Sequence, residues 1–504
     1  MEERDVVVIG AGHNGLCAAT LLARRGLDVL AVERRDVVGG AAVTEELLPG
    51  FRFSTCAYAA HLLHPKVLAA LGVELEELRL LPLPPPLVVL PDGHVVRRDA
   101  DDQDGSLRDA LGSHDAGAAR RWTADWRVLA GVFERFVLDE PPTLEDLAVA
   151  ADDGHHQETF ARFATKSVEA LLEDTFASPA ARAAFAPTYF EDDPSRPGGP
   201  LSYLYTALGE LRPRALRGLP TGGMGTVTRA FARAAHAAGV EVRTGSEVAS
   251  IEVEDGRAAG VCLADGNRLA ARAVVSSCDP KRTLRLLPTG ALPSSLEELS
   301  AAPAGAKLHC ALRGDPDLSL LGGNSSAIGL VHVLPTHDWL TRGYVDATSG
   351  AWPQSSLVEL QLPTLHDSTL APAGCQVLSV FLPLAPPRLA SGPWDDRRDE
   401  LADLLLERAA AAIPNVRELV IDRVVHTPAD IERRVGLTGG NIHHLPHTLA
   451  LLGAGRPLAG FADGGTPLPS LFLCGAGIHP GGEVSGAPGF NAARVVAEAL
   501  TASG

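Results

Sequence analysis

This sequence has few cysteines, and their spacing argues against a cysteine-based framework. The seven cysteines are scattered between Cys17 and Cys474, none belongs to a C-x-x-C pair, and their number is odd. A disulfide scaffold or a zinc knuckle needs clustered cysteines, so both are disfavoured. Reduced and packed thiols are typical of a cytoplasmic protein, and we expect that location.

The sequence also lacks an apolar run of roughly 20 residues, the length that a transmembrane helix requires. The apolar stretch 81–91 is broken by Pro82 and by the three prolines at 84–86, which cannot continue a helix. The first predicted strand begins by Asp5, which leaves no room for a signal or transit peptide. We expect no transmembrane span, and peripheral contact with a membrane stays open.

The chain has fewer basic than acidic residues. The chain has 44 basic and 62 acidic residues, for a formal net charge of -18. This charge disfavours nucleic acid or a strongly anionic membrane surface as the main partner. Hydrophobic residues make up 46% of the 504 positions, enough for two or three domains with large cores.

The predicted elements form a discontinuous α/β arrangement. A buried strand at 5–9, a helix at 14–25 and a strand at 29–33 make a βαβ opening. The same alternation of helix and short strand is predicted again, with a helix at 226–238 and a strand at 240–243. There follow a three-strand meander, expected at 247–254, 258–263 and 268–271, and a further strand at 273–277. We predict a Rossmann-type cofactor domain from 1–75, 215–290 and 465–504, and an α+β substrate domain from 76–214 and 291–464.

Two short segments of the expected substrate domain have a predicted local structure. Pro91-Asp-Gly93 predicts a hairpin turn between short strands, and the polar stretch 99–116 predicts a loose surface loop.

The loop after the first strand has the spacing of a dinucleotide-binding turn. In Gly10-Ala-Gly-His-Asn-Gly15, the first glycine permits the tight turn and Gly12 lets the backbone approach a pyrophosphate. Gly15 lets helix and strand pack closely, and the helix N-terminus carries partial positive charge. His13 and Asn14 complete the loop as candidate cofactor contacts.

Glu33 ends the second strand, at the usual spacing for an acid that accepts from a ribose hydroxyl. A 2′-phosphate would meet its carboxylate, so NAD and FAD both fit and NADP does not. A second glycine-rich segment, 471–494, follows another apolar strand some 460 residues later. One dinucleotide site built from both ends of a chain is a flavoprotein arrangement, which favours FAD.

These segments resemble the phytoene-desaturase-like FAD oxidoreductases, a large flavin family that includes the amine oxidases. The likeness is greatest to the branch of bacterial β-carotene ketolases and pyridine nucleotide-disulfide oxidoreductase domain-containing proteins. It is carried by 6–44, Gly50-Phe-Arg-Phe53, Gly439-Gly-Asn-Ile442 and 471–494. It implies a glutathione-reductase-like, amine oxidase/phytoene desaturase type of FAD-binding domain.

The resemblance also assigns cofactor contacts. The segment after Glu33 would hold the adenosine, diphosphate and ribityl parts, Val248 would offer backbone atoms to adenine, and the C-terminal loop and helix would close the site. The implied residues are Arg34, Arg35, Gly39, Gly40, Ala41, Thr44, Val248, Gly475, Ala476, Gly477, Ser485, Gly486, Ala487, Pro488 and Asn491.

This chain departs from the family pattern at three C-terminal positions. Ile478 replaces a threonine, Glu483 replaces a small residue and Phe490 replaces an arginine that could meet a phosphate or a substrate carboxylate. Two side chains in this segment are candidate catalytic groups. His479 could accept a proton near the flavin, or hydrogen-bond to loop backbone. Glu483 could do the same chemistry, or face solvent.

The histidines His443, His444 and His447 have a spacing that resembles metal ligands. Pro446 breaks the helix that would align them, and no acid or cysteine nearby in the sequence completes a set, so we predict no metal site. They remain candidates for cavity lining. For Cys56, Tyr58, His61 and His64 we expect helix packing in preference to cavity lining.

The sequence therefore predicts an FAD-dependent oxidoreductase. It would take a hydride from a small, largely apolar or amphipathic organic substrate, by dehydrogenation, desaturation or oxidation. No second complete G-x-G-x-x-G unit is present, so oxygen or a quinone is the expected electron acceptor. The alternatives are a carotenoid-type ketolase, a flavin amine oxidase, an FAD-binding scaffold with little turnover, and an NAD-dependent dehydrogenase that uses only the first loop.

Overall fold

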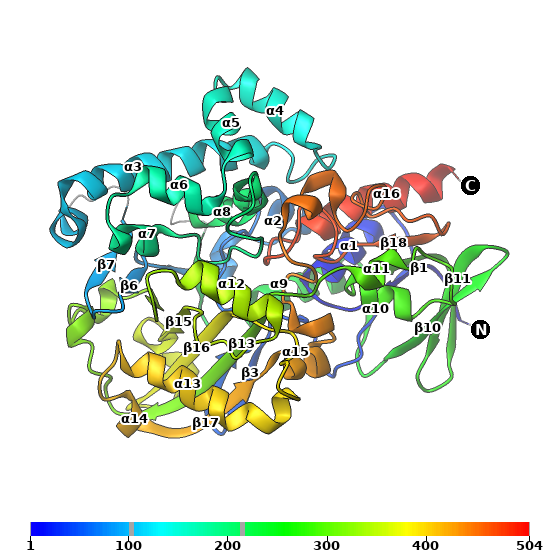
Figure 1. The fold of residues 1–504 in the computed structure, drawn as a ribbon. Coiled ribbons are helices and arrows are strands. Elements are labelled where there is room, and N and C mark those ends of the chain that lie inside the picture. The colour runs from blue at the N-terminus through cyan, green and yellow to red at the C-terminus, as the bar shows by residue number, and fades with distance from the viewer. Residues whose placement is uncertain (1, 100–104, 212–216, 503–504) are drawn as a thin grey trace.

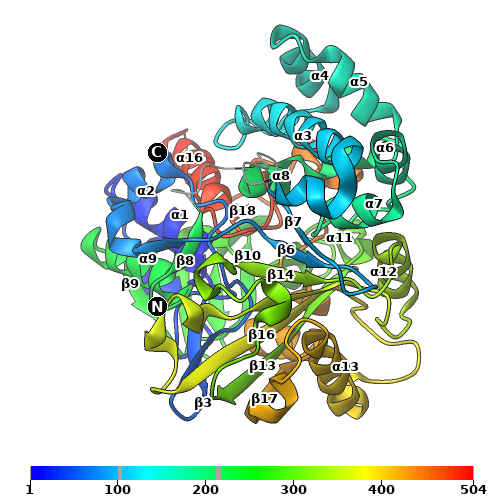
Figure 2. The same cartoon turned by 90° about the vertical axis from the view of Figure 1, so that its left-hand side faces the viewer.

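The computed structural model describes residues 2–99, 105–211 and 217–502. Two seven-stranded sheets form the frame of the molecule, and a layer of helices covers one end of it. Figures 1 and 2 show this helical layer above the second sheet, and Figure 1 shows strand β1 and the C-terminal helix together on the right of the view.

The first sheet combines strands from the two ends of the chain and from its middle. Its parallel part has the order β18, β12, β1, β2, β9, and β10 and β11 extend it as an antiparallel meander on β12. The strands are β1 Glu2–Ile9, β2 Val29–Val32, β9 Glu241–Arg243, β10 Val248–Glu254, β11 Arg257–Leu263, β12 Arg268–Ser276 and β18 Leu471–Leu473. Valines on β1 and β12 are fully buried because helices cover the parallel strands.

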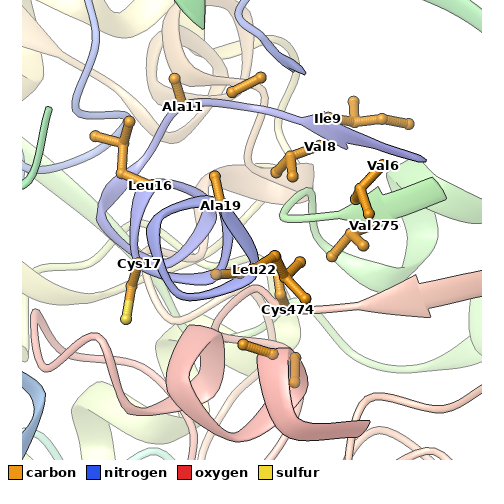
Figure 3. Close-up of a cluster of buried hydrophobic side chains, with 14 of the residues drawn as sticks. Val6, Val8, Ile9, Ala11, Leu16, Cys17, Ala19, Leu22, Val275 and Cys474 are labelled. Carbon is orange, nitrogen blue, oxygen red and sulfur yellow. The ribbon is translucent and has the colours of Figure 1, made fainter. Parts of the chain in front are cut away.

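Three helices pack beside this sheet and join the chain ends. They are α1 His13–Ala23, α9 Gly225–Ala237 and α16 Ala487–Ala502. Figure 3 shows α1 between the strands and the C-terminal helix, with Cys17 on the side that faces α16. The approach is close because Gly489 has no side chain: a Cβ there would lie 2.1 Å from the Asn14 carbonyl oxygen.

The second sheet is mixed and has the order β17, β13, β16, β15, β14, β6, β7. Its strands are β6 Leu87–Val89, β7 Val95–Arg97, β13 Ala304–Arg313, β14 Leu330–Val333, β15 Val358–Gln361, β16 Cys375–Ala385 and β17 Val420–His426. The helix α13, Arg398–Ala410, packs on one face of this sheet and completes a buried aliphatic core. The predicted hairpin around Pro91-Asp-Gly93 is present as β6 and β7.

Smaller elements connect the two sheets. Two short antiparallel pairs are β3 Thr44–Leu48 with β4 Phe51–Ser54, and β5 Leu80–Pro82 with β8 Gly218–Pro220. The connecting helices are α2 Pro65–Leu71, α10 Pro280–Arg285, α11 Ser295–Glu298, α12 Trp339–Ser349, α14 Val416–Leu419 and α15 Pro428–Val435.

The helical layer carries many large aromatic side chains. It contains α3 Ser106–Glu134, α4 Leu144–Asp153, α5 Gln157–Thr165, α6 Val168–Thr175, α7 Pro179–Phe185 and α8 Leu204–Leu211. Trp122 and Trp126 pack edge to face, at 5.7 Å between ring centroids. The loop predicted at 99–116 is wrong from Ser106 onward, because the chain is helical there and alanines at 116, 118 and 119 are buried on α3.

One predicted strand boundary differs from the structure, and one domain boundary is not tested by it. The strands expected at 268–271 and 273–277 are one continuous strand, β12, because it pairs with β1 along its whole length. The predicted domain boundary between 214 and 215 lies outside the described residues, and the division into cofactor and substrate domains stays a prediction. Among the residues that the structure describes, no helix has both the length and the apolar character to cross a membrane.

Candidate active site

The turn between β1 and α1 opens a cavity, which we call the glycine-loop cavity. Gly10 has a φ of +93°, and a Cβ on Gly15 would lie 2.2 Å from the Gly10 carbonyl oxygen. Only glycine fits both positions. The Glu33 carboxylate accepts from the backbone N–H of Ala11 and of Arg35, each at 3.0 Å, and is thereby held at the rim of this turn.

The glycine-loop cavity extends from the acid to a group of rings. Its lining includes Glu33 and Val248 on the side of the first sheet, and Tyr58, His61 and Phe381 on the side of the second. The glycine loop lines the same cavity. This arrangement fits an extended dinucleotide, with the ribose beside the acid and the pyrophosphate at the helix N-terminus.

The C-terminal segment reaches the same cavity. Nε2 of the His13 ring lies 3.2 Å from the Glu483 carbonyl oxygen, and both residues line the cavity with Val484. Ser485 then accepts a hydrogen bond from the Tyr205 hydroxyl at 2.8 Å. The two distant glycine-rich segments are therefore brought together in the structure.

The candidate cofactor residues divide into two groups. Those that line the glycine-loop cavity are Gly10, Gly12, His13, Asn14, Gly15, Glu33, Arg34, Gly40, Ala41, Val248 and Ala476. The others lie behind the lining: Arg35, Gly39, Thr44, Gly475, Gly477, Ser485, Gly486, Ala487, Pro488 and Asn491.

Several residues of the second group have a visible structural role. The guanidinium of Arg35 donates to Glu45 at 2.7 Å and to the Gly40 carbonyl at 3.4 Å, so it braces the second glycine segment from behind. Thr44 accepts from the Gly225 backbone N–H, and Asn491 donates to the Val137 carbonyl. These residues shape the cavity without forming its wall.

His479 does not line the cavity. Its ring Nε2 is 2.8 Å from the Phe136 carbonyl oxygen, and the ring packs edge to face on Phe133. Burial lowers the pKa of this histidine to about 4. The geometry therefore supports the backbone-bonded alternative for His479 and gives no support to a role as general base.

Glu483 has a different position, at the junction of two cavities. Its side chain is 17% exposed, and it lines the glycine-loop cavity and a second cavity described below. Its φ of +71° is a left-handed conformation that non-glycine residues rarely adopt. Such backbone strain persists where the surrounding structure holds it, and it clusters at functional sites.

The second cavity lies under the helical layer, and we call it the tryptophan cavity. Its volume is about 570 Å³. Apolar walls come from Trp122, Trp126 and Phe185, together with the prolines at 84–86. Three residues line both cavities, His61, Tyr189 and Glu483, and we call these the neck.

A buried hydrogen-bonded chain runs beside the neck. The Tyr58 hydroxyl contacts the Tyr189 hydroxyl, which donates to Glu359 at 2.7 Å. His332 Nε2 lies 2.8 Å from the same carboxylate, and the Gln361 amide donates to its other oxygen at 3.1 Å. Burial acts to raise the pKa of Glu359, but its hydrogen bonds with His332 and the tyrosines outweigh that effect and lower it.

Lys307 adds a buried amine next to this chain. Its ammonium donates to the Ser54 and Cys56 carbonyls and lies 4.5 Å from the centre of the Tyr58 ring. Burial lowers the pKa of Lys307 to about 7. Electrostatic interactions with Cys56 and Glu359 oppose this effect of burial only in part.

The expectations for the segment after Phe53 are partly wrong. Tyr58 and His61 line the glycine-loop cavity, where helix packing was expected. His64 is the N-cap of α2 and accepts from the Lys66 backbone N–H. Cys56 is buried behind the cavity lining, and all seven cysteines, which lie within the described ranges, are free thiols.

An acid joins the histidine group, contrary to the expectation from the sequence, because it comes from far away along the chain. Glu191, His443 and His447 place ligand-type atoms within 4.8 Å of one another. The Glu191 carboxylate lies 3.0 Å from His443 Nδ1 and accepts from the His447 backbone N–H at 2.8 Å. His447 Nε2 in turn accepts from the Gly482 backbone N–H. These atoms already have partners, so the geometry is that of an ion pair in a hydrogen-bonded cluster.

Arg456 holds this cluster in place. Its guanidinium is 1% exposed and donates to the carbonyls of His443, Leu445, Pro446 and Ala476. Burial acts to lower the pKa of His443, but the Glu191 carboxylate outweighs it and raises the pKa. His443 and His444 line the glycine-loop cavity, as their candidacy for cavity lining predicts, whereas His447 packs on Tyr205.

Known proteins match this chain over nearly its whole length. The family model described as flavin containing amine oxidoreductase matches residues 15–497. Pyridine nucleotide-disulfide oxidoreductase domain-containing protein 2 of Rattus norvegicus is 32% identical, over 98% of this chain and 93% of the relative. Prolycopene isomerase, chloroplastic, of Daucus carota is 24% identical, over 95% of this chain and 77% of the relative.

Solved structures show the same fold at lower identity. Cyclohexylamine oxidase from Brevibacterium oxydans IH-35A superposes with a TM-score of 0.61 over 99% of each chain, at 19% identity. The comparisons confirm the resemblance and the Rossmann-type FAD-binding fold that the glycine segments predict.

Proposed function

We propose a reaction for this chain from the premise that it belongs to the flavin containing amine oxidoreductase family and is an FAD-dependent oxidoreductase. The enzyme takes a hydride from a largely apolar organic donor that is held in the tryptophan cavity. The observation that carries this proposal is the neck, where His61, Tyr189 and Glu483 line the cofactor-shaped cavity and the apolar cavity together.

The residues present fit FAD. Backbone at Gly12 and Gly40 lies open on the cavity, as a diphosphate requires, and the two strands of backbone approach so closely that a Cβ on Gly40 would lie 3.3 Å from the Gly12 Cα. Asn14 Oδ1 is buried in this wall without a partner among the described residues, so it can accept from the cofactor. Glu33 would hold the ribose and Val248 the adenine. When bound, FAD supplies the acceptor for a hydride, which carries two electrons.

The tryptophan cavity supports a donor with a bulky apolar body. Trp122, Trp126 and Phe185 offer large surfaces for hydrocarbon. Desaturation, ketolation and amine oxidation all begin with such a donor. Oxygen or a quinone is the proposed acceptor of the electrons, in a cytoplasmic enzyme.

An anaerobic reduction screen tests this function. Purified protein reconstituted with FAD is mixed with limonene, phytoene, cyclohexylamine or putrescine, and bleaching of the flavin absorbance is followed. We expect bleaching by at least one bulky apolar donor, and a loss of at least tenfold in its rate, at unchanged FAD content, when Trp126 is replaced by Ala. Leu144→Ala, at an exposed position of α4, is the matched control.

Two outcomes would contradict the proposal. Protein that takes up no FAD but binds NAD tightly would be a nicotinamide dehydrogenase. Protein that holds FAD but is reduced by dithionite alone, and by no organic donor, would be a flavin-binding scaffold.

A further inference from the structure

The neck contains more hydrogen-bonding capacity than a hydrocarbon donor can use. Both ring nitrogens of His61 are buried and have no hydrogen-bond partner within the described protein. The imidazole lines each of the two cavities. Burial lowers the pKa of His61, which favours the neutral ring, with one nitrogen that donates and one that accepts a hydrogen bond.

The Glu483 carboxylate lies at the same junction. Nε2 of His443 is 3.9 Å from its Oε1, beyond hydrogen-bonding distance. The strained backbone at this residue is held by the contact between its carbonyl oxygen and the His13 ring. Glu483 also stands where the family resemblance places a small residue, so the carboxylate at the neck is a feature of this chain.

A hydrocarbon in contact with these groups would leave them without partners. An unsatisfied buried polar group is costly, and a site that is built to hydrogen-bond a substrate hydroxyl therefore discriminates strongly against the analogue that lacks it. Tyr189, the third neck residue, already donates its hydroxyl hydrogen to Glu359, so the groups that lack a partner are those of His61 and Glu483.

The charges around the neck favour a neutral partner over a cation. The carboxylates of Glu359 and Glu483 each lie beside a histidine, His332 at 2.8 Å and His443 at 3.9 Å. The Glu191 carboxylate raises the pKa of His443 and pairs with its ring at 3.0 Å, on the side away from Glu483 Oε1, which is 3.9 Å from Nε2.

The remaining charged side chains of the tryptophan cavity point to the same preference. Its lining includes the guanidinium groups of Arg98, Arg127 and Arg217, and the carboxylates of Asp99 and Glu210. Arg98 and Glu210 form an ion pair at 3.6 Å. With Glu359 and Glu483 the lining has four carboxylates against three guanidinium groups, so its charges nearly balance and give an ammonium no strongly acidic site, whereas a hydroxyl needs none.

We propose that the donor is an alcohol, with its hydroxyl on the carbon that loses the hydride and its apolar body against Trp122 and Trp126. This inference rests on the proposed function, because FAD must supply the oxidant. The C–H bond breaks and its hydrogen leaves with both electrons to that acceptor. The O–H bond, which donates to Glu483, breaks and its proton passes to that carboxylate, while the C=O bond forms. The N–H of the neutral His61 ring donates to the same oxygen from the other side of the neck.

Three terpenes that differ in one substituent test this inference. Limonene, perillyl alcohol and perillylamine carry hydrogen, hydroxyl and amine on the same carbon. Each is titrated anaerobically into the FAD-loaded protein, and the dissociation constant is taken from the shift in the flavin absorbance spectrum or from saturation of the bleaching rate. We expect perillyl alcohol to bind at least tenfold more tightly than limonene or perillylamine, and to bleach the flavin.

Variants at the neck show whether the two side chains cause this preference. In His61→Phe and in Glu483→Leu, the ratio of the limonene and perillyl alcohol dissociation constants should fall below about threefold, with FAD content unchanged. His337→Phe, an exposed histidine outside the lining of both cavities, is the matched control and should keep the wild-type ratio.

The inference is overturned if limonene binds as tightly as the alcohol, if perillylamine binds best, if none of the three binds, or if the preference survives in both neck variants. The proposed function fails in a different way, through absence of FAD or through a flavin that no organic donor reduces. Preferential binding of the alcohol without reduction of the flavin would refute the oxidation and leave the recognition by the neck intact.

Discussion

Glu33 is the side chain whose removal should weaken cofactor binding most directly. Its carboxylate accepts two backbone hydrogen bonds at the glycine loop and lines the cavity at the expected ribose. Hydrogen bonds to a charged group contribute about 1.5–3 kcal/mol, so Glu33→Ala should weaken FAD binding roughly 10- to 100-fold. Fluorescence titration of the apoprotein with FAD measures this. Glu297→Ala, at an exposed ion pair with Arg285, should leave the affinity within about twofold.

Lys307 should give the stability of the protein a distinct pH dependence. Its pKa is about 7 in the folded chain and 10.5 in the unfolded chain, so between these values the unfolded state binds one more proton. The contribution of Lys307 to stability therefore rises with pH from 7 to 10.5, by about 1.4 kcal/mol per pH unit at most. Urea unfolding of wild type and Lys307→Met at several pH values isolates this slope. Identical pH profiles in the two proteins would disprove it.

At the scale of single residues, the sequence predicts what local chemistry dictates. The spacing of the motif alone predicts that Gly12 and Glu33 lie at the dinucleotide site. Tyr189 and Glu359 do not, because their meeting depends on how a loop and a strand of the second sheet approach each other. A signal was present, since His332 interrupts an apolar strand and Glu359 and Gln361 alternate with apolar residues in a fully buried one, a pattern typical of buried hydrogen-bonded networks.

Among the helices, the contact between α1 and α16 should be the most sensitive to added volume. A Cβ at Gly489 would meet the Asn14 carbonyl at 2.1 Å, and backbone cannot move aside as a flexible side chain can. We expect Gly489→Ala to destabilise the protein by about 1–3 kcal/mol and to reduce FAD retention. Chemical unfolding and the ratio of flavin to protein absorbance measure the two effects.

Gly131 in α3 is the matched control. A Cβ there would find no atom within 4 Å, and the residue lies inside a helix. Gly131→Ala should therefore stabilise the protein by about 0.5–1 kcal/mol and leave FAD binding unchanged. Destabilisation by both substitutions would contradict the steric explanation of the helix contact.

Element positions were predictable where periodicity is strong. The βαβ opening and the meander on β12 follow from short apolar runs and from glycine at the turns. The start of α3 was not predictable, because the chain from Ser106 to Ala116 is polar and becomes helical through the burial of alanines against neighbouring helices. Tertiary packing overrides local composition there.

Over the whole molecule, FAD should act as a structural part of the first sheet and its helices. A ligand that binds only the folded state stabilises it by about 2.7 kcal/mol at a free concentration one hundred times the dissociation constant. We expect the thermal midpoint of the apoprotein to rise with added FAD in a concentration-dependent way. Calorimetry across a range of FAD concentrations tests this, and a midpoint that does not move would argue against a preformed cavity.

The joining of the N-terminal and C-terminal glycine segments has a consequence for biosynthesis. Strand β18 pairs with β12, and α16 closes against α1, so the cavity wall is incomplete until the C-terminal helix has left the ribosome. Flavin capture is therefore a post-translational event for this polypeptide. A product terminated before β18 should emerge colourless, and coloration of the nascent protein would report that translation has passed the final helix.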